Sequence, residues 1–412
     1  MIGAGVFAAF GPAARAAGAG LVIGLGVAAV IAYCNAVASA QLAAVYPTSG
    51  GTYVYGRERL GAWWGFAAGW AFVIGKTASC AAMALTFASY AVPGPWWAQR
   101  LVGVAAVLAL AGLNYRGVSK TATLTRVLVG LTLIALAVVV VGIWAGGRAR
   151  VANLDGWASL TAGGGLHGVL QAAGLLFFAF AGYARIATMG EEVRNPAHTI
   201  PRAIPTALAI TVAVYLVVAL SALSAGGPGV LAHASSPLTA AVQAAGAGGV
   251  APAVRIGGAV ASLGALLALI AGIGRTSLAM ARNGDLPASL AAVHPRFRVP
   301  HHAELALAAI VSVLVLTTDL RGVIGFSSFG VLVYYGIANA AAFTQPREQR
   351  RWPRALNVLG ICGCVVLALS LPAASVVAGA VVLALGLVGR VLLGPPHASG
   401  LSADLRKAGD QS

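Results

Sequence analysis

The chain has 412 residues, of which 59% are hydrophobic and 9% charged, and it carries a formal net charge of +16. With a mean hydropathy of +0.88, this composition excludes an ordinary soluble globular domain and indicates an integral membrane protein. The basic residues are scattered through short loops without aromatic clusters, so they do not predict nucleic-acid binding.

Apolar segments follow one another along almost the entire chain. Residues 16–56 contain no Lys, Arg, Asp or Glu, a stretch longer than the roughly 20 residues that one helix needs to cross a bilayer. We predict one transmembrane domain over residues 1–393 and a disordered cytoplasmic tail at 394–412. The predicted spans are twelve, with a short first one, at 6–16, 20–46, 61–92, 98–113, 122–145, 166–190, 203–225, 250–281, 304–318, 322–343, 355–371 and 373–393.

The distribution of basic residues predicts the orientation in the cell membrane. With the N-terminus in the cytoplasm, 17 Lys and Arg residues fall on the cytoplasmic side and six on the opposite side. Because cytoplasmic loops carry an excess of basic residues, both termini are expected in the cytoplasm. No metal or cofactor is predicted, since the seven histidines lie in loops or at span ends and the four cysteines lie in apolar runs.

Two predicted spans are interrupted by glycine. The first begins with IGAGVF at residues 2–7, and the sixth contains Gly182 before it ends at Glu191 and Glu192. Unwound backbone inside a bilayer is tolerated only where protein or water satisfies its hydrogen bonds. Freed amides can then bind a carboxylate and freed carbonyls an ammonium group. Such breaks at corresponding positions predict an inverted-repeat transporter with a midplane site, and glycine kinks in packed helices are the alternative.

Several motifs then resemble a known family. They are YPTSGGTYVYGRERLG at 46–61, NYRGVSKTA at 114–122, FFAFAGY at 177–183, EEVRNPAHTIPRAI at 191–204 and RTSLAMARNGDLP at 275–287. With IGAGVF, they resemble the amino acid permeases of the amino acid, polyamine and organocation superfamily, and most closely bacterial relatives of cationic amino acid transporters. The resemblance implies an all-α, leucine-transporter-type fold with a five-plus-five inverted repeat, its halves at 1–145 and 166–343, plus two extra helices at 355–393.

The same resemblance implies the substrate-binding residues. Backbone groups of Ile2, Gly3, Ala4 and Gly5 would hold a substrate carboxylate. The amino group would be held by Phe178 and by the carbonyls of Ala181 and Gly182.

The chain departs from the family pattern at three places. Only Met1 and Ile2 precede the first glycine motif, so the first half-helix is missing and we expect a misassigned start or a fragment. Tyr183 and Ala184 follow the glycine of the sixth span, where relatives often have an acid. Thr132 occupies the place of a lysine found in the fifth span of some proton-coupled relatives.

Arg57 and Arg59 belong to an amphipathic segment at 52–60 that is predicted to lie on the cytoplasmic surface. Glu191 and Glu192 lie at a helix C-terminus, where the helix dipole disfavours negative charge. We therefore predict a cytoplasmic gate in which these arginines pair with these acids in one conformation. The alternative is a structural connector with snorkelling arginines.

Lys76 lies about 15 residues into the third span, roughly 22 Å from its cytoplasmic end and thus near mid-bilayer. None of the ten acids lies near the middle of a span, although intramembrane cations usually face a cavity and have a partner. Three interpretations stay open: a neutral lysine, a lysine bound by carbonyls and water, or one paired with the substrate carboxylate. Lys76 is therefore our candidate for both substrate binding and proton coupling.

The predicted function is a secondary active amino acid permease that works by alternating access, with the proton as coupling ion and the lipid bilayer as its environment. Because Lys76 has no acidic partner in the spans, zwitterionic amino acids are favoured over cationic amino acids or polyamines, the alternative substrates. A channel would need a continuous polar pore. A membrane-embedded enzyme would need intramembrane acids or a nucleophile with its base, so no enzyme is predicted. The sequence predicts no oligomeric state.

Overall fold

The computed structural model describes residues 2–47, 50–116, 122–154, 164–183 and 195–393, and these residues are helical apart from their connections. The helices of the first half are α1 (Gly5–Ala17), α2 (Leu21–Val45), α3 (Thr52–Leu60), α4 (Ala62–Ala91), α5 (Trp96–Tyr115) and α6 (Ala122–Ala145). Those of the second half are α7 (Gly165–Phe180), α9 (Pro196–His233), α10 (Pro237–Ala244), α11 (Ala251–Arg282), α12 (His301–Thr317) and α13 (Leu320–Phe343), followed by α14 (Arg354–Ser370) and α15 (Ala373–Leu393).

Within the described ranges, eight helical stretches are long and apolar enough to cross a membrane. Three shorter apolar helices, α7, α12 and α14, accompany them. Helices α1 and α2 form one of the eight stretches, Gly5–Val45, because only a short 3₁₀ turn separates them. The expectation of an all-helical, multi-pass membrane protein is therefore confirmed, with eight to eleven apolar helical stretches in the described ranges, one of which contains two of the twelve predicted spans.

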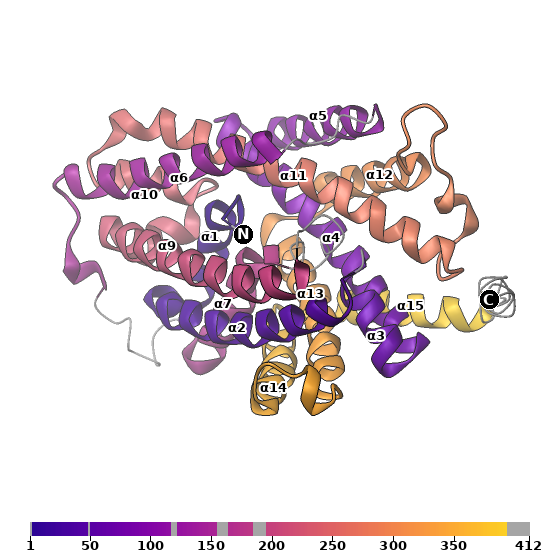
Figure 1. The fold of residues 1–412 in the computed structure, drawn as a ribbon. Coiled ribbons are helices and arrows are strands. Elements are labelled where there is room, and N and C mark those ends of the chain that lie inside the picture. Colours follow the sequence, from indigo (N-terminus) through magenta and orange to yellow (C-terminus); the bar gives the residue numbers. More distant parts are fainter. Residues whose placement is uncertain (1, 48–49, 117–121, 155–163, 184–194, 394–412) are drawn as a thin grey trace, which may run out of the picture.

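Helix α4 runs through the middle of the bundle, where it crosses α13 (Figure 1). Glycines permit this crossing: a Cβ on Gly330 of α13 would lie 2.7 Å from the carbonyl oxygen of Ala71 and 2.9 Å from the Cα of Gly75. Small residues allow backbones to approach closely in membrane helix pairs, where lipid supplies no hydrophobic drive between helices. The central position of α4 places its buried residues, including Lys76, inside the bundle.

Helix α9 bends near its end. Gly226 and Gly227 have non-helical backbone, and Gly227 has a φ of 73°, a conformation that favours glycine. The predicted span at 203–225 ends at this bend. The segment beyond it reaches the end of α1, where the Arg15 side chain donates to the Ala232 carbonyl at 3.2 and 2.7 Å. This connection covers the C-terminal end of α1.

Candidate functional site

The start of α1 provides one wall of the predicted site. Residues 2–4 precede the helix, and a Cβ on Gly3 would meet no atom within 4 Å. By contrast, a Cβ on Gly5 would lie 2.7 Å from the Cα of Ala179 in α7. Gly5 thus provides the close approach of α1 to α7, whereas Gly3 borders open space.

The end of α7 provides the second wall. The α-helix stops at Phe180 and a 3₁₀ turn, Ala181–Tyr183, follows. The last carbonyls of an α-helix lack intrahelical partners, so other groups must satisfy them. The buried Tyr215 hydroxyl of α9 donates to the Ala179 carbonyl at 3.1 Å and accepts the backbone N–H of Gly3. Tyr215 therefore connects the two walls.

Lys76 meets this broken end of α7. Its Nζ lies 3.2 Å from the Ala181 carbonyl oxygen, and the residue is only 7% exposed. No carboxylate forms an ion pair with Lys76 within the described part of the chain. Of the three interpretations left open by the sequence, this contact corresponds to a lysine bound by a carbonyl. The arrangement joins a buried amine to a carbonyl at the end of α7, which Tyr215 connects to Gly3.

Phe178 and Gly182 complete the set of predicted substrate contacts. Phe178 lies in the last turn of α7 and is buried, with 8% exposure. Gly182 is exposed within the 3₁₀ turn, next to Ala181. Ile2 is partly buried against the core, and Ala4 is buried. The predicted residues thus lie on two adjacent chain segments and on α4, although the segment after Tyr183 belongs to the residues outside the description.

The two acids of the predicted gate, Glu191 and Glu192, lie outside the described residues, whereas its two arginines, Arg57 and Arg59, lie within them. Arg57 has a different acidic neighbour: its Nη1 lies 3.5 Å from Oδ2 of Asp285, which follows α11. Arg59 donates to the Thr344 hydroxyl at 3.2 Å and to the Thr344 carbonyl. Both arginines therefore have partners in this conformation.

Asp285 is the centre of a buried cluster that the sequence analysis did not identify. Its side chain is 0% exposed; it accepts a 2.7 Å hydrogen bond from the Tyr53 hydroxyl and lies 2.6 Å from Nη1 of Arg390. Burial, together with the Asp285 carboxylate, raises the pKa of Tyr53 to about 12, so this hydroxyl stays a donor. The Asp285 cluster, defined as Tyr53, Arg57, Asp285 and Arg390, joins α3, the end of α11 and α15.

Arg390 is one of the 17 basic residues assigned from the sequence to the cytoplasmic side, and it lies in α15, inside the predicted span 373–393, with its side chain buried. The guanidinium lies over the rings of Trp63 and Phe66, 5.0 and 4.6 Å from their centroids. Such stacking stabilises a partly desolvated arginine beyond its ion pair. Nothing in the sequence around Asp285 or Arg390 predicted that these two residues pair.

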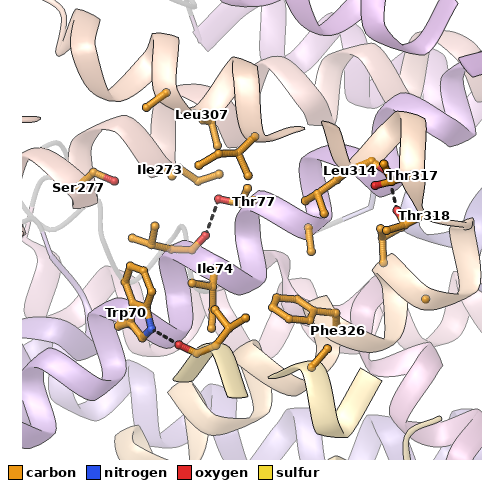
Figure 2. Close-up of a pocket in the computed structure, with 18 of the residues that line it drawn as sticks. Trp70, Ile74, Thr77, Ile273, Ser277, Leu307, Leu314, Thr317, Thr318 and Phe326 are labelled. Carbon is orange, nitrogen blue, oxygen red and sulfur yellow. Dashed lines mark hydrogen bonds between the residues drawn. The ribbon is translucent and has the colours of Figure 1, made fainter. Parts of the chain in front are cut away.

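A large cavity lies elsewhere. It has a volume of about 980 Å³ and lies between α4, α12, α13 and α15, where Figure 2 shows Ile74, Leu307, Leu314 and Phe326 around it. Neither Lys76 nor any of the predicted contacts on α1 and α7 lines it. This cavity is therefore separate from the place where the broken helices meet.

Comparison with known proteins identifies the family. A sequence model of a family described as amino acid permease matches residues 1–392. An uncharacterized transporter of Mycobacterium tuberculosis is 59% identical over 94% of this chain and 86% of its own length. The branched-chain amino acid permease BcaP of Bacillus subtilis is 27% identical over 94% and 88%, respectively. The chloroplastic cationic amino acid transporter 7 of Arabidopsis thaliana is 29% identical over 83% and 62%.

Proposed function

Since this chain belongs to the amino acid permease family, we propose that it is a secondary active permease for zwitterionic amino acids. The chain is a transporter and not an enzyme. Its substrate would bind between the start of α1 and the end of α7, and the site would open alternately to the two sides of the membrane. The bundle would form the five-plus-five inverted repeat of the leucine-transporter type, with both termini in the cytoplasm.

One observation carries the proposal: the hydrogen bond from Lys76 to the Ala181 carbonyl, at 3.2 Å. It places a buried amine at the point where α7 stops, beside the segment that precedes α1. Half-helix ends of this kind recognise both charged groups of an amino acid, since amides attract the carboxylate and freed carbonyls attract the ammonium. A substrate ammonium would compete with Lys76 for the Ala181 carbonyl, while Lys76 would turn toward the substrate carboxylate.

The charge balance favours substrates with neutral side chains. Lys76 already contributes a cation, and the described residues around it supply no carboxylate ion pair. A basic side chain would add a second cation to a desolvated site, which is costly without a partner. The relatives differ on this point, because one is named for branched-chain and another for cationic amino acids. Cationic amino acids are therefore the competing substrate class.

Proton coupling follows from the same residue. A lysine that releases its proton when the site faces one side, and regains it on the other, would couple substrate movement to the proton gradient. In the neutral state Lys76 would keep only its bond to Ala181. In the charged state it would attract the substrate carboxylate, so proton and substrate would be carried together.

Uptake by purified protein in liposomes tests the proposal. We expect saturable uptake of leucine or serine, stimulated by an inward proton gradient and inhibited by other neutral amino acids. Tight, saturable uptake of arginine with no competition from neutral amino acids would overturn the substrate class. Unsaturable ion conductance without amino acid uptake would instead indicate a channel.

A further inference from the structure

The 980 Å³ cavity is lined on α4 by residues that include Trp70, Ile74 and Thr77, and Lys76 is not among its lining residues. Its lining is almost entirely apolar, and α12 and α15 border it with exposed apolar surface, such as Ile310 at 54% and Val381 at 51% exposure. Apolar side chains exposed on the membrane-spanning part of a helix face hydrocarbon and not water. The volume is at the upper end of the range of small-ligand sites. An apolar groove of this size is suited to a hydrocarbon chain.

One end of the groove lies at the level of lipid headgroups. Trp96 and Trp97, at the start of α5, are 69% and 56% exposed, and tryptophans concentrate at membrane–water interfaces. Arg100 stacks on Trp96, with its Cζ 5.2 Å from the ring centroid, and it also lines the groove. From Thr317 at this end to Ala303 at the other, α12 borders the groove for roughly 21 Å, which exceeds the ~15 Å depth of one leaflet.

The polar groups at this end carry both signs of charge. Arg100 donates to the carbonyls of Leu316 and Thr318, which fixes its guanidinium beside the start of α13. The exposed Asp319, which caps α13 through the Gly322 amide at 3.0 Å, lines the same end. A cation next to an anion complements a headgroup that carries a phosphate and an ammonium. A headgroup with only negative charge would bring its phosphate toward Asp319 without an ammonium to compensate.

We propose that this groove, between α12 and α15 beside α4, is a binding site for a zwitterionic phospholipid with an ammonium headgroup. One acyl chain lies along Ile74, Leu307 and Phe326 (Figure 2). The phosphate meets Arg100 and the ammonium meets Asp319. Because Trp70 donates to the Val382 carbonyl at 2.9 Å, α15 is joined to α4 beside the groove, and the lipid fills the remaining space between them.

Retention of lipids by the purified full-length protein provides the test. Native mass spectrometry after exposure to equal amounts of phosphatidylethanolamine and phosphatidylglycerol should show one retained phosphatidylethanolamine. Ala306→Trp fills the groove, whereas Ala309→Trp alters an exposed alanine of the same helix that does not line it. We expect Ala306→Trp to reduce retention about tenfold, as when two methylenes lose their contacts, and Ala309→Trp to leave it unchanged.

The headgroup contacts have their own variants. Arg100→Gln should weaken retention of both lipids, and Asp319→Asn, which preserves the helix cap, should abolish the preference for phosphatidylethanolamine. Arg148→Gln, at an exposed arginine outside the groove, is the control. Equal retention by the two tryptophan variants, or a wild-type preference for phosphatidylglycerol, would overturn the proposal.

A second copy of the chain is the competing occupant. In a background with the exposed Cys362 replaced by Ser, Ala306→Cys should form no disulfide-linked dimer in native membranes. Efficient dimer formation through Ala306→Cys but not Ala309→Cys would show that protein covers the groove and would exclude the lipid site.

Discussion

Two buried basic residues in this bundle, Arg390 and Lys76, have different kinds of partner. Arg390 has a carboxylate, Asp285, at 2.6 Å and two aromatic rings around it, whereas Lys76 has a single backbone carbonyl at 3.2 Å. In a buried ion pair with stacked aromatic rings, each charge is compensated by its counter-ion. A buried amine with one carbonyl can still accept a new counter-ion. The contrast indicates a structural role for the Asp285 cluster and a functional role for Lys76.

The first way to test this comparison is Lys76→Met. We expect proton-driven accumulation of substrate in proteoliposomes to fall to the level of protein-free vesicles, because the buried amine at the broken end of α7 is removed. Substrate exchange should persist, since the walls formed by α1 and α7 remain. Arg148→Met, at an exposed site, is the matched control. Undiminished accumulation in Lys76→Met would remove Lys76 from the coupling mechanism.

Substitutions at Gly3 and Gly5 distinguish an effect on substrate binding from an effect on helix packing. Gly3→Leu adds a side chain where its first carbon meets nothing within 4 Å, so the protein should fold and substrate binding should be lost. Gly5→Ala places a methyl group 2.7 Å from Ala179, so the melting temperature should fall even in the absence of substrate. Thermal unfolding with and without substrate measures both effects. Substrate-induced stabilisation that survives in Gly3→Leu would contradict the midplane site.

Asp285→Asn tests the structural side of the comparison. Replacing the carboxylate leaves Arg390 buried without a counter-ion, which costs about 3 kcal/mol for a pair of this kind. The melting temperature should fall by several degrees, while Glu348→Gln, at an exposed acid, should leave it unchanged. The double variant Asp285→Leu/Arg390→Leu should recover part of the loss. No recovery would mean that the pair does more than neutralise charge.

The smallest effect is expected at Arg57, whose side chain is 34% exposed and 3.5 Å from Asp285. If Arg57 exchanges this partner for Glu191 or Glu192 during opening, Arg57→Glu should change cysteine accessibility from the cytoplasm by a few-fold. A second reversal, Glu192→Arg, should restore it. Additive effects of the two reversals would show that the residues do not interact.

The helices were predictable because membrane spans leave strong local signals. Long apolar runs gave most boundaries within a few residues of those observed, although α9, Pro196–His233, extends beyond both ends of the predicted span 203–225. The break after Phe180 was also predictable, since glycine in an apolar run weakens a helix. The position of Lys76 followed from its depth in the span, but its partner did not, because Ala181 contributes only a backbone carbonyl.

The Asp285 cluster could not be predicted from local sequence patterns. Asp285 sits in a connection and Arg390 near the end of an apolar helix, where each looks solvated when considered alone. Their burial results from packing among α3, α4 and α15, which only the tertiary structure brings together. Likewise, the close packing of Gly5 against Ala179 could not be predicted from the sequence, and the backbone contact of Gly5 with substrate stays a prediction.

The contact between Gly5 and Ala179 also restricts how the site can open. Because Gly5 has no side chain, the backbones of α1 and α7 are in direct contact at Ala179. A shift of one helix along the other would bring atoms of the two backbones into a clash. Tyr215 strengthens this contact, because its hydroxyl forms hydrogen bonds to Gly3 and to Ala179. When the site changes from one side of the membrane to the other, α1 and α7 would therefore move together as a rigid body relative to the remaining helices. The hinges would lie at the ends of these two helices.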